Sequence, residues 1–168
     1  MQVHQVLALV KLLSEQTIYT FSLASSGGFL KSNLNYFEKC IDKTAVRPPG
    51  QDESENDGTD ITQEEQYYTF SDHMEQDLLA LHAKIFANLM ANQHSAKFIA
   101  RTNLGSLRYA FMAYSAVMRG GQGVDESIGK DLMEGLGALL KQKEPIQLIN
   151  KNTYIANWYY YRMYEVYL

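Results

Sequence analysis

The sequence predicts an all-α fold, a single helical bundle of about five to six helices with one long acidic loop. Apolar residues recur at intervals of three and four along most of the 168-residue chain, which is the spacing of one helix face. Clusters of glycine and proline separate these periodic segments. Residues 146–149 could form one short extended piece, but no strand pattern is convincing and no internal repeat is evident. The whole chain, 1–168, is therefore expected to be one domain of ordinary size.

Residues 1–43 are expected to form an N-terminal helical hairpin. Its first helix should run from Gln2 to about Leu23, and residues 25–28 should end it because paired glycines favour turns. Charged or titratable side chains interrupt this apolar segment at His4, Lys11 and Glu15. A membrane-spanning helix needs about 20 mostly apolar residues, and a signal peptide needs a charged start and a cleavage site. We therefore interpret the segment as a buried amphipathic helix.

The second helix of this hairpin is predicted over Phe29–Ile41, where apolar residues again recur at helical spacing. The prolines and glycine at 48–50 end regular structure. The acidic loop covers residues 44–66, and its stretch 51–65 is polar, with Ile61 as its one branched apolar residue. We interpret it as a solvated, flexible loop, with a specific acidic binding site as the alternative.

Residues 67–168 are predicted to form the C-terminal helices. The first covers roughly Phe70–Asn92, with Ser71 as its N-cap and acidic residues near its positive end. The next covers roughly Ser95–Met118, where apolar residues again recur at helical spacing.

Two further helices are expected after the glycines at 120–123. One starts near Asp125 and runs towards Pro145, with leucines along its buried face. The last begins at Thr153 and is rich in tyrosine, which favours a core or interface position.

No motif for catalysis or metal binding emerges. The chain has four histidines, but it has no Glu-x-x-His, His-Glu-x-x-His or paired Cys-x-x-Cys pattern. The glycines at 120–123 lack the strand and the Gly-Lys-Ser/Thr of a P-loop. We therefore expect no enzyme activity, no catalytic residues, no metal and no cofactor. Cys40 is the single cysteine and is interpreted as a small apolar helix residue of a cytoplasmic protein.

Charge is unevenly distributed along a chain whose net charge is −4. An acidic stretch, Gln51–Asp77, is followed by Leu78–Val124, which has no Asp or Glu. If residues 95–118 form one helix, four cations fall within about 40° of one another on its edge, because successive residues turn by about 100°. These four cations, together with one on the preceding helix, are the predicted nucleic-acid contacts: Lys97, Arg101, Arg108, Arg119 and Lys84.

Two interpretations of this basic edge stay open. A row of cations can follow several phosphates and release their counterions, which would make binding dependent on salt. Alternatively, the edge is solvated or is paired with acids of another helix. The chain would then be a helical protein–protein adaptor without nucleic-acid contact, docking through its aromatic last helix and its N-terminal hairpin. Gly105 matters here, because a break there would misalign Lys97 and Arg101 with the other cations.

The terminal segment 152–162 reads Asn-Thr-Tyr-Ile-Ala-Asn-Trp-Tyr-Tyr-Tyr-Arg. It is similar in character to the closing segment of some large subunits of type I CRISPR surveillance complexes (Cascade), where a Phe precedes a Leu-Gly-Tyr-Tyr run. Asn157 stands where that pattern has Gly. With its basic helix edge and with Met1 leading directly into a helix, the chain resembles the small subunit of these complexes, which several subtypes produce by internal translation of the large-subunit gene.

The resemblance implies a non-catalytic subunit of a ribonucleoprotein effector complex. Such a subunit would scaffold the assembly and contact the backbones of guide RNA and target DNA without reading their sequence. Its partners would be the other subunits, nucleic acid and further copies of itself, with no membrane.

Overall fold

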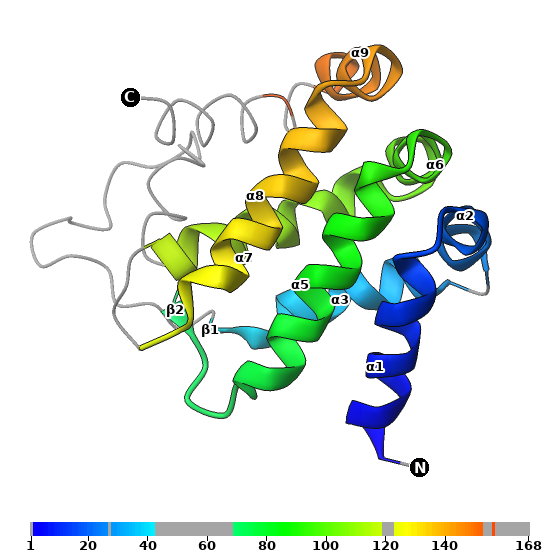
Figure 1. Cartoon of the computed structure of the whole chain (residues 1–168). Helices are drawn as coiled ribbons and strands as arrows, with labels where there is room; N and C mark the ends of the chain where they lie inside the picture. Colours follow the sequence, from blue (N-terminus) through cyan, green and yellow to red (C-terminus); the bar gives the residue numbers. More distant parts are fainter. Residues whose placement is uncertain (1, 27, 43–68, 119–122, 153–155, 157–168) are drawn as a thin grey trace, which may run out of the picture.

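The computed structural model describes residues 2–26, 28–42, 69–118, 123–152 and 156 (Figure 1). Helices make up most of these residues, which confirms the all-α prediction. In this part of the chain the strands are two short pieces, β1 (Ile41–Asp42) and β2 (Thr69–Phe70), which pair antiparallel with Ile41 opposite Phe70. The predicted loop 44–66 and the predicted helix from Thr153 lie outside the described residues, apart from Ala156.

Three kinked helical units lie side by side. In each unit a longer helix ends at a sharp corner and a shorter helix continues from it: α1 (Val3–Ser14) with α2 (Thr17–Ser25), α5 (Gln76–Ala91) with α6 (Gln93–Thr102), and α8 (Glu126–Leu140) with α9 (Lys143–Lys151). Helix α5 packs between α1 and α8, and α6 packs between α2 and α9. Figure 1 shows α1, α5 and α8 running in the same direction, with α2, α6 and α9 in a row beyond their ends.

Two helices return the chain behind this layer. Helix α3 (Phe29–Cys40) packs on α5, and α7 (Leu107–Met118) packs on α8. The two also pack on each other, and a short 3₁₀ turn, η2 (Leu104–Ser106), leads into α7. The described chain therefore alternates kinked units with return helices, although its sequence shows no repeat.

A residue with extended backbone makes each corner. The φ and ψ angles are −92° and 114° at Gln16, −85° and 122° at Asn92, and −103° and 129° at Gln142. The Asn92 side chain caps α6, because its Oδ1 accepts from the backbone N–H groups of His94 and Ser95 at 3.0 and 3.1 Å. A side-chain cap of this kind satisfies N–H groups that have no partner within the helix.

Side-chain amides also tie neighbouring units together. Asn92 Nδ2 donates to Thr20 Oγ1 of α2 at 3.4 Å, and Asn88 Nδ2 donates to Ser14 Oγ of α1 at 2.9 Å. At the next corner, Gln142 Nε2 lies 3.5 Å from the backbone oxygen of Met90 in α5. These bonds fix how far each unit can slide along its neighbour.

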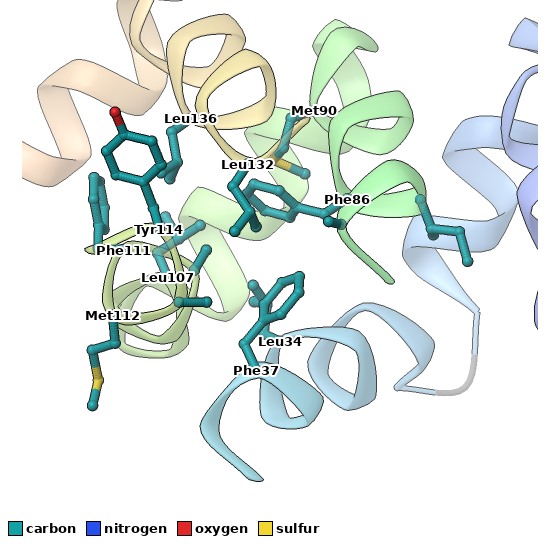
Figure 2. Packing of buried hydrophobic residues seen from close by; sticks show 14 of the residues in the cluster. Leu34, Phe37, Phe86, Met90, Leu107, Phe111, Met112, Tyr114, Leu132 and Leu136 are labelled. Carbon is teal, nitrogen blue, oxygen red and sulfur yellow. The ribbon is translucent and has the colours of Figure 1, made fainter. Parts of the chain in front are cut away.

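The core lies between the two layers. Figure 2 shows Phe37 of α3 and Phe86 of α5 turned towards Leu132 of α8, and all three are fully buried. Helices α5 and α8 approach so closely that a Cβ at Gly135 would lie 2.6 Å from Phe86 Cε1. Glycine at 135 is thus required by this packing.

Three helix predictions need correction. The first helix, predicted over Gln2–Leu23, is two helices, because the chain bends at Glu15 and Gln16. The helix predicted over Phe70–Asn92 begins only at Gln76, since Phe70 is held in β2 by its pairing with Ile41. Ser71 is consequently no N-cap, and its hydroxyl accepts from the His73 N–H in the intervening turn.

The helix predicted over Ser95–Met118 is also interrupted. Asn103 has φ −135° and ψ 32°, outside the helical region, and the 3₁₀ turn that contains Gly105 follows it. Thr102 Oγ1 donates to the backbone oxygen of Phe98, the kind of bond by which Ser and Thr compete with helix continuation. Residues 146–149, considered as an extended piece, are helical in α9.

Two element predictions are confirmed. Helix α3 spans Phe29–Cys40. Helix α8 starts after Asp125, whose carboxylate accepts from the Ser127 N–H at 2.9 Å as an N-cap. The helix ends at Leu140, however, so the predicted continuation towards Pro145 is wrong, and Pro145 lies in the separate helix α9.

The contact between α5 and α8 predicts different effects for two glycines of α8. Gly135→Ala should lower the free energy of unfolding by about 1–3 kcal/mol, because the added methyl group meets Phe86. Gly137→Ala meets nothing within 4 Å and should be neutral or stabilising by up to about 1 kcal/mol, since alanine favours helix. Chemical denaturation measures both, and equal stability of the two variants would contradict this packing.

Candidate nucleic-acid interface

The structure separates the predicted basic residues. Lys97 and Arg101 lie on α6, Arg108 lies on α7, and Lys84 lies on α5. Arg119 is outside the described residues. Because the chain leaves helical geometry at Asn103, the prediction of a single continuous helix edge is wrong, whereas contact of these residues with nucleic acid stays a prediction.

Two of the described cations, Lys84 on α5 and Arg108 on α7, contact residues outside α6. Lys84 Nζ forms an ion pair with Asp131 Oδ1 of α8 at 3.3 Å, across the contact between α5 and α8. The Arg108 guanidinium lies 5.0 Å from the centre of the Tyr109 ring and donates to the Tyr109 hydroxyl at 3.2 Å. Both side chains are therefore oriented by neighbours on their own part of the bundle.

Lys97 and Arg101 share one carboxylate, that of Glu144 on α9. Lys97 Nζ lies 3.8 Å from Glu144 Oε2, and Arg101 Nε donates to Glu144 Oε1 at 2.7 Å. A terminal nitrogen of Arg101 also contacts Oε1. The arginine remains 62% exposed, so solvent screens much of this attraction.

A groove between α6 and α9 adjoins this ion pair. Its volume is about 470 Å³, and these residues line it: Gln93, Lys97, Gln142, Lys143, Glu144, Gln147, Leu148 and Lys151. Lys143 and Lys151 are exposed, and neither pairs with a carboxylate in the described part of the chain. We call the set Lys97, Arg101, Lys143 and Lys151 the α6–α9 basic cluster.

The basic cluster carries a local excess of positive charge. Three lysines, Lys97, Lys143 and Lys151, are among the described residues that line the groove, and Glu144 is the one carboxylate among them. Arg101 lies beside the groove through its ion pair with Glu144. Lys143 and Lys151 were not predicted as contacts, because the periodicity of a single helix does not relate them to the residues of α6. The available signal was the lysine-rich run at 141–151, but its proximity to α6 depends on the fold.

A second polar cluster is buried between α3 and α5. The His82 ring stacks on Tyr36 with centroids 4.0 Å apart, and Asn33 Nδ2 lies 2.9 Å from His82 Nδ1 and 3.1 Å from its backbone oxygen. An amide nitrogen can only donate, so His82 Nδ1 accepts and its ring is neutral. Burial lowers the pKa of His82 to about 4.

Cys40 lies at the end of α3, beside this cluster. Burial raises the pKa of its thiol to about 11 and holds the pKa of Tyr36 well above its usual range. The thiol is therefore protonated at neutral pH, and a protonated thiol is a poor nucleophile. In the described residues, no three His, Cys, Asp or Glu side chains gather as a metal site would require.

None of the described helices combines the length and apolarity that crossing a membrane requires. Comparison of the chain with protein-family models, curated proteins and solved structures found no match.

The buried histidine predicts a pH-dependent stability. In the unfolded chain His82 binds a proton below about pH 6.5, whereas in the folded chain it does so only below about pH 4. The free energy of unfolding should therefore fall as pH drops from 6.5 to 4, by roughly 3 kcal/mol at 1.36 kcal/mol per pKa unit. Urea denaturation at several pH values measures this loss.

The matched variants for this measurement are His82→Leu and His94→Gln. The first removes the buried ring and should flatten the stability profile over this pH range, even though it lowers stability at neutral pH. The second changes an exposed histidine and should leave the slope unchanged. An unaltered slope in His82→Leu would show that other groups cause the acid sensitivity.

Proposed function

We propose that this protein is a non-catalytic helical subunit that contacts the phosphate backbone of nucleic acid through the α6–α9 basic cluster. The proposal rests on three lysines from two helices, Lys97, Lys143 and Lys151, which line one groove. Arg101 is held next to them by Glu144, the single carboxylate of the described lining. The phosphate backbone of nucleic acid is a polyanion that such a cluster can bind, because each phosphate that a cation neutralises releases its counterions.

Glu144 is placed to act as an internal substitute for phosphate. It accepts hydrogen bonds from Arg101 and forms an ion pair with Lys97, so it keeps both side chains aimed towards the groove. Ion pairs with this much solvent exposure contribute little to stability, so exchanging the carboxylate for a phosphate costs little. Arginine can then contact a phosphate with two N–H groups.

The start of α9 adds to the positive potential. Its N-cap residue, Gln142, makes no side-chain cap bond, and Lys143 and Glu144 occupy its first turn. The N–H groups of a helix start and its dipole both favour an anion. This contribution supports the lysines and is secondary to them.

The groove lining indicates contact with weak sequence preference. The described residues of its lining are glutamine, lysine, glutamate and one leucine, and none of these described side chains has an aromatic ring on which a base could stack. Stacking platforms and base-edge contacts are what distinguish bases in single strands. We therefore expect binding that follows charge and chain length more than sequence.

Membership of a type I CRISPR complex stays a prediction of the resemblance alone. The same holds for guide RNA, target DNA and neighbouring subunits as the natural partners. The alternative function, a protein–protein adaptor, is favoured by a different surface, the exposed apolar residues of α1 and α2.

Charge reversal at the cluster provides the test. The double variant Lys143→Glu/Lys151→Glu should weaken binding of a labelled single-stranded oligonucleotide by at least about tenfold at low salt, because it turns two phosphate contacts into repulsions. Fluorescence anisotropy measures the affinity. For the unaltered chain, four neutralised phosphates predict a slope of roughly −3 in log affinity against log salt.

The matched control is Lys31→Glu/Lys130→Glu, which makes the same change in net charge at exposed lysines of α3 and α8. It should retain most of the affinity. Equal losses in the two double variants would show a response to net charge alone, and no binding by the unaltered chain at low salt would contradict the proposal.

A further inference from the structure

Helix α1 exposes the positions that its counterparts α5 and α8 bury. Counted back from the last residue of each helix, Val6 corresponds to Ala83 and Leu132, which are fully buried. By the same count Leu9 corresponds to Phe86 and Gly135. Yet Val6 is 43% exposed and Leu9 is 53% exposed.

Six apolar residues are exposed along α1 and α2. They are Val3, Val6, Leu9 and Leu12 on α1, with Ile18 and Tyr19 on α2. Helix α2 buries its small residues Thr20 and Ala24, and its Ile18 and Tyr19 side chains are exposed. We call these six residues the α1–α2 apolar face.

Among the described elements, no helix covers this edge of the fold. Behind α5 lies α3, and behind α8 lies α7. For α1, the described helices that pack against it over any length are α2 and α5 alone. Figure 1 shows α1 and α2 at one edge of the row of units, so nothing described there occupies the place that a return helix takes elsewhere.

The corner residue of this unit is also without a partner. The amides of Asn92 and Gln142 each reach back to the preceding unit. The corresponding corner residue in α1–α2 is Gln16, which is exposed and whose side chain bonds to no described residue. This edge therefore has exposed apolar residues and a corner amide. In the other units the equivalent groups contact a neighbouring unit.

We propose that the α1–α2 apolar face binds a second copy of this chain and forms a two-fold dimer. The charge of the face supports this occupant. Lys11 and Glu15 pair with each other at 3.6 Å, and the six residues of the face carry no charge. Two such faces meet without like-charge repulsion, as a contact between identical patches requires. None of the six residues of the face is a cation that could contact a nucleic-acid phosphate.

The opposite edge of the fold favours two-fold pairing over head-to-tail stacking. The exposed side of α8 carries Lys130, Glu134 and Lys141, which would be desolvated against an apolar partner. Pairing α1–α2 with its own copy buries apolar side chains on both sides. Helix α1 is about 18 Å long at 1.5 Å per residue, so its part of the face extends over about three helical turns.

Sedimentation equilibrium of the full chain tests the dimer. The unaltered protein should have twice the chain mass at high micromolar concentration and should dissociate on dilution. Leu9→Glu places a charge at the centre of the face and should raise the dissociation constant by at least about tenfold. Its circular dichroism should stay unchanged, because the side chain is already half exposed.

Met133→Glu is the matched control, since Met133 is an exposed apolar residue on α8, outside the face. It should leave the dimer intact. The proposal is overturned if the unaltered chain is monomeric at every concentration. That result is expected if a different protein or another segment of the chain covers the face. Dissociation of both variants to the same extent would also overturn it.

Cross-linking locates the interface independently of affinity. Leu9 lies near the middle of α1, so a two-fold axis through the face brings Leu9 close to its own copy. Leu9→Cys should form a disulfide-linked dimer with a copper-phenanthroline oxidant, and Lys31→Cys on α3 should not. A Leu9→Cys chain that stays uncross-linked would contradict the two-fold arrangement. Cross-linking does not depend on nucleic-acid binding, so its result tests the dimer independently of the α6–α9 proposal.

Discussion

The close packing of α5 against α8 is the constraint on which the other contacts depend. Gly135 lets Phe86 fit against the backbone of α8, and Phe86 also meets Phe37 of α3 edge-to-face at 5.9 Å. A buried aromatic ring that touches both layers fixes their separation. Because α6 and α9 continue directly from α5 and α8, the same contact sets the spacing of the groove.

The groove combines this rigid spacing with exposed, exchangeable charges. Gln142 ties the α8–α9 corner to α5 through the Met90 backbone oxygen, so the start of α9 is held against its neighbour. Lys97 then lines the groove together with Lys143 and Lys151, and Arg101 pairs with Glu144 of the same lining. A surface of this kind can follow a flexible polyanion, because the frame is fixed while the long cationic side chains adjust.

Sequence periodicity predicted the all-α class, α3 and the start of α8, because these depend on local spacing and on one N-cap, Asp125. It did not predict the corners at Gln16 and Gln142, because helical spacing continues across both. At Gln142 the side chain reaches the Met90 backbone oxygen of another unit, a contact that only the fold brings about. For the site, Lys97 and Arg101 were identified from their helix. Lys143 and Lys151 were missed because only the packing of α9 on α6 brings them close.

The central claim is that Glu144 occupies the place of a nucleic-acid phosphate. The most direct measurement is the affinity of Glu144→Gln for a single-stranded oligonucleotide at low salt, by fluorescence anisotropy. Removing the competing carboxylate frees Lys97 and Arg101, so binding should strengthen several-fold and the dependence on salt should steepen. Unchanged or weaker binding, with the fold intact by circular dichroism, would contradict the account.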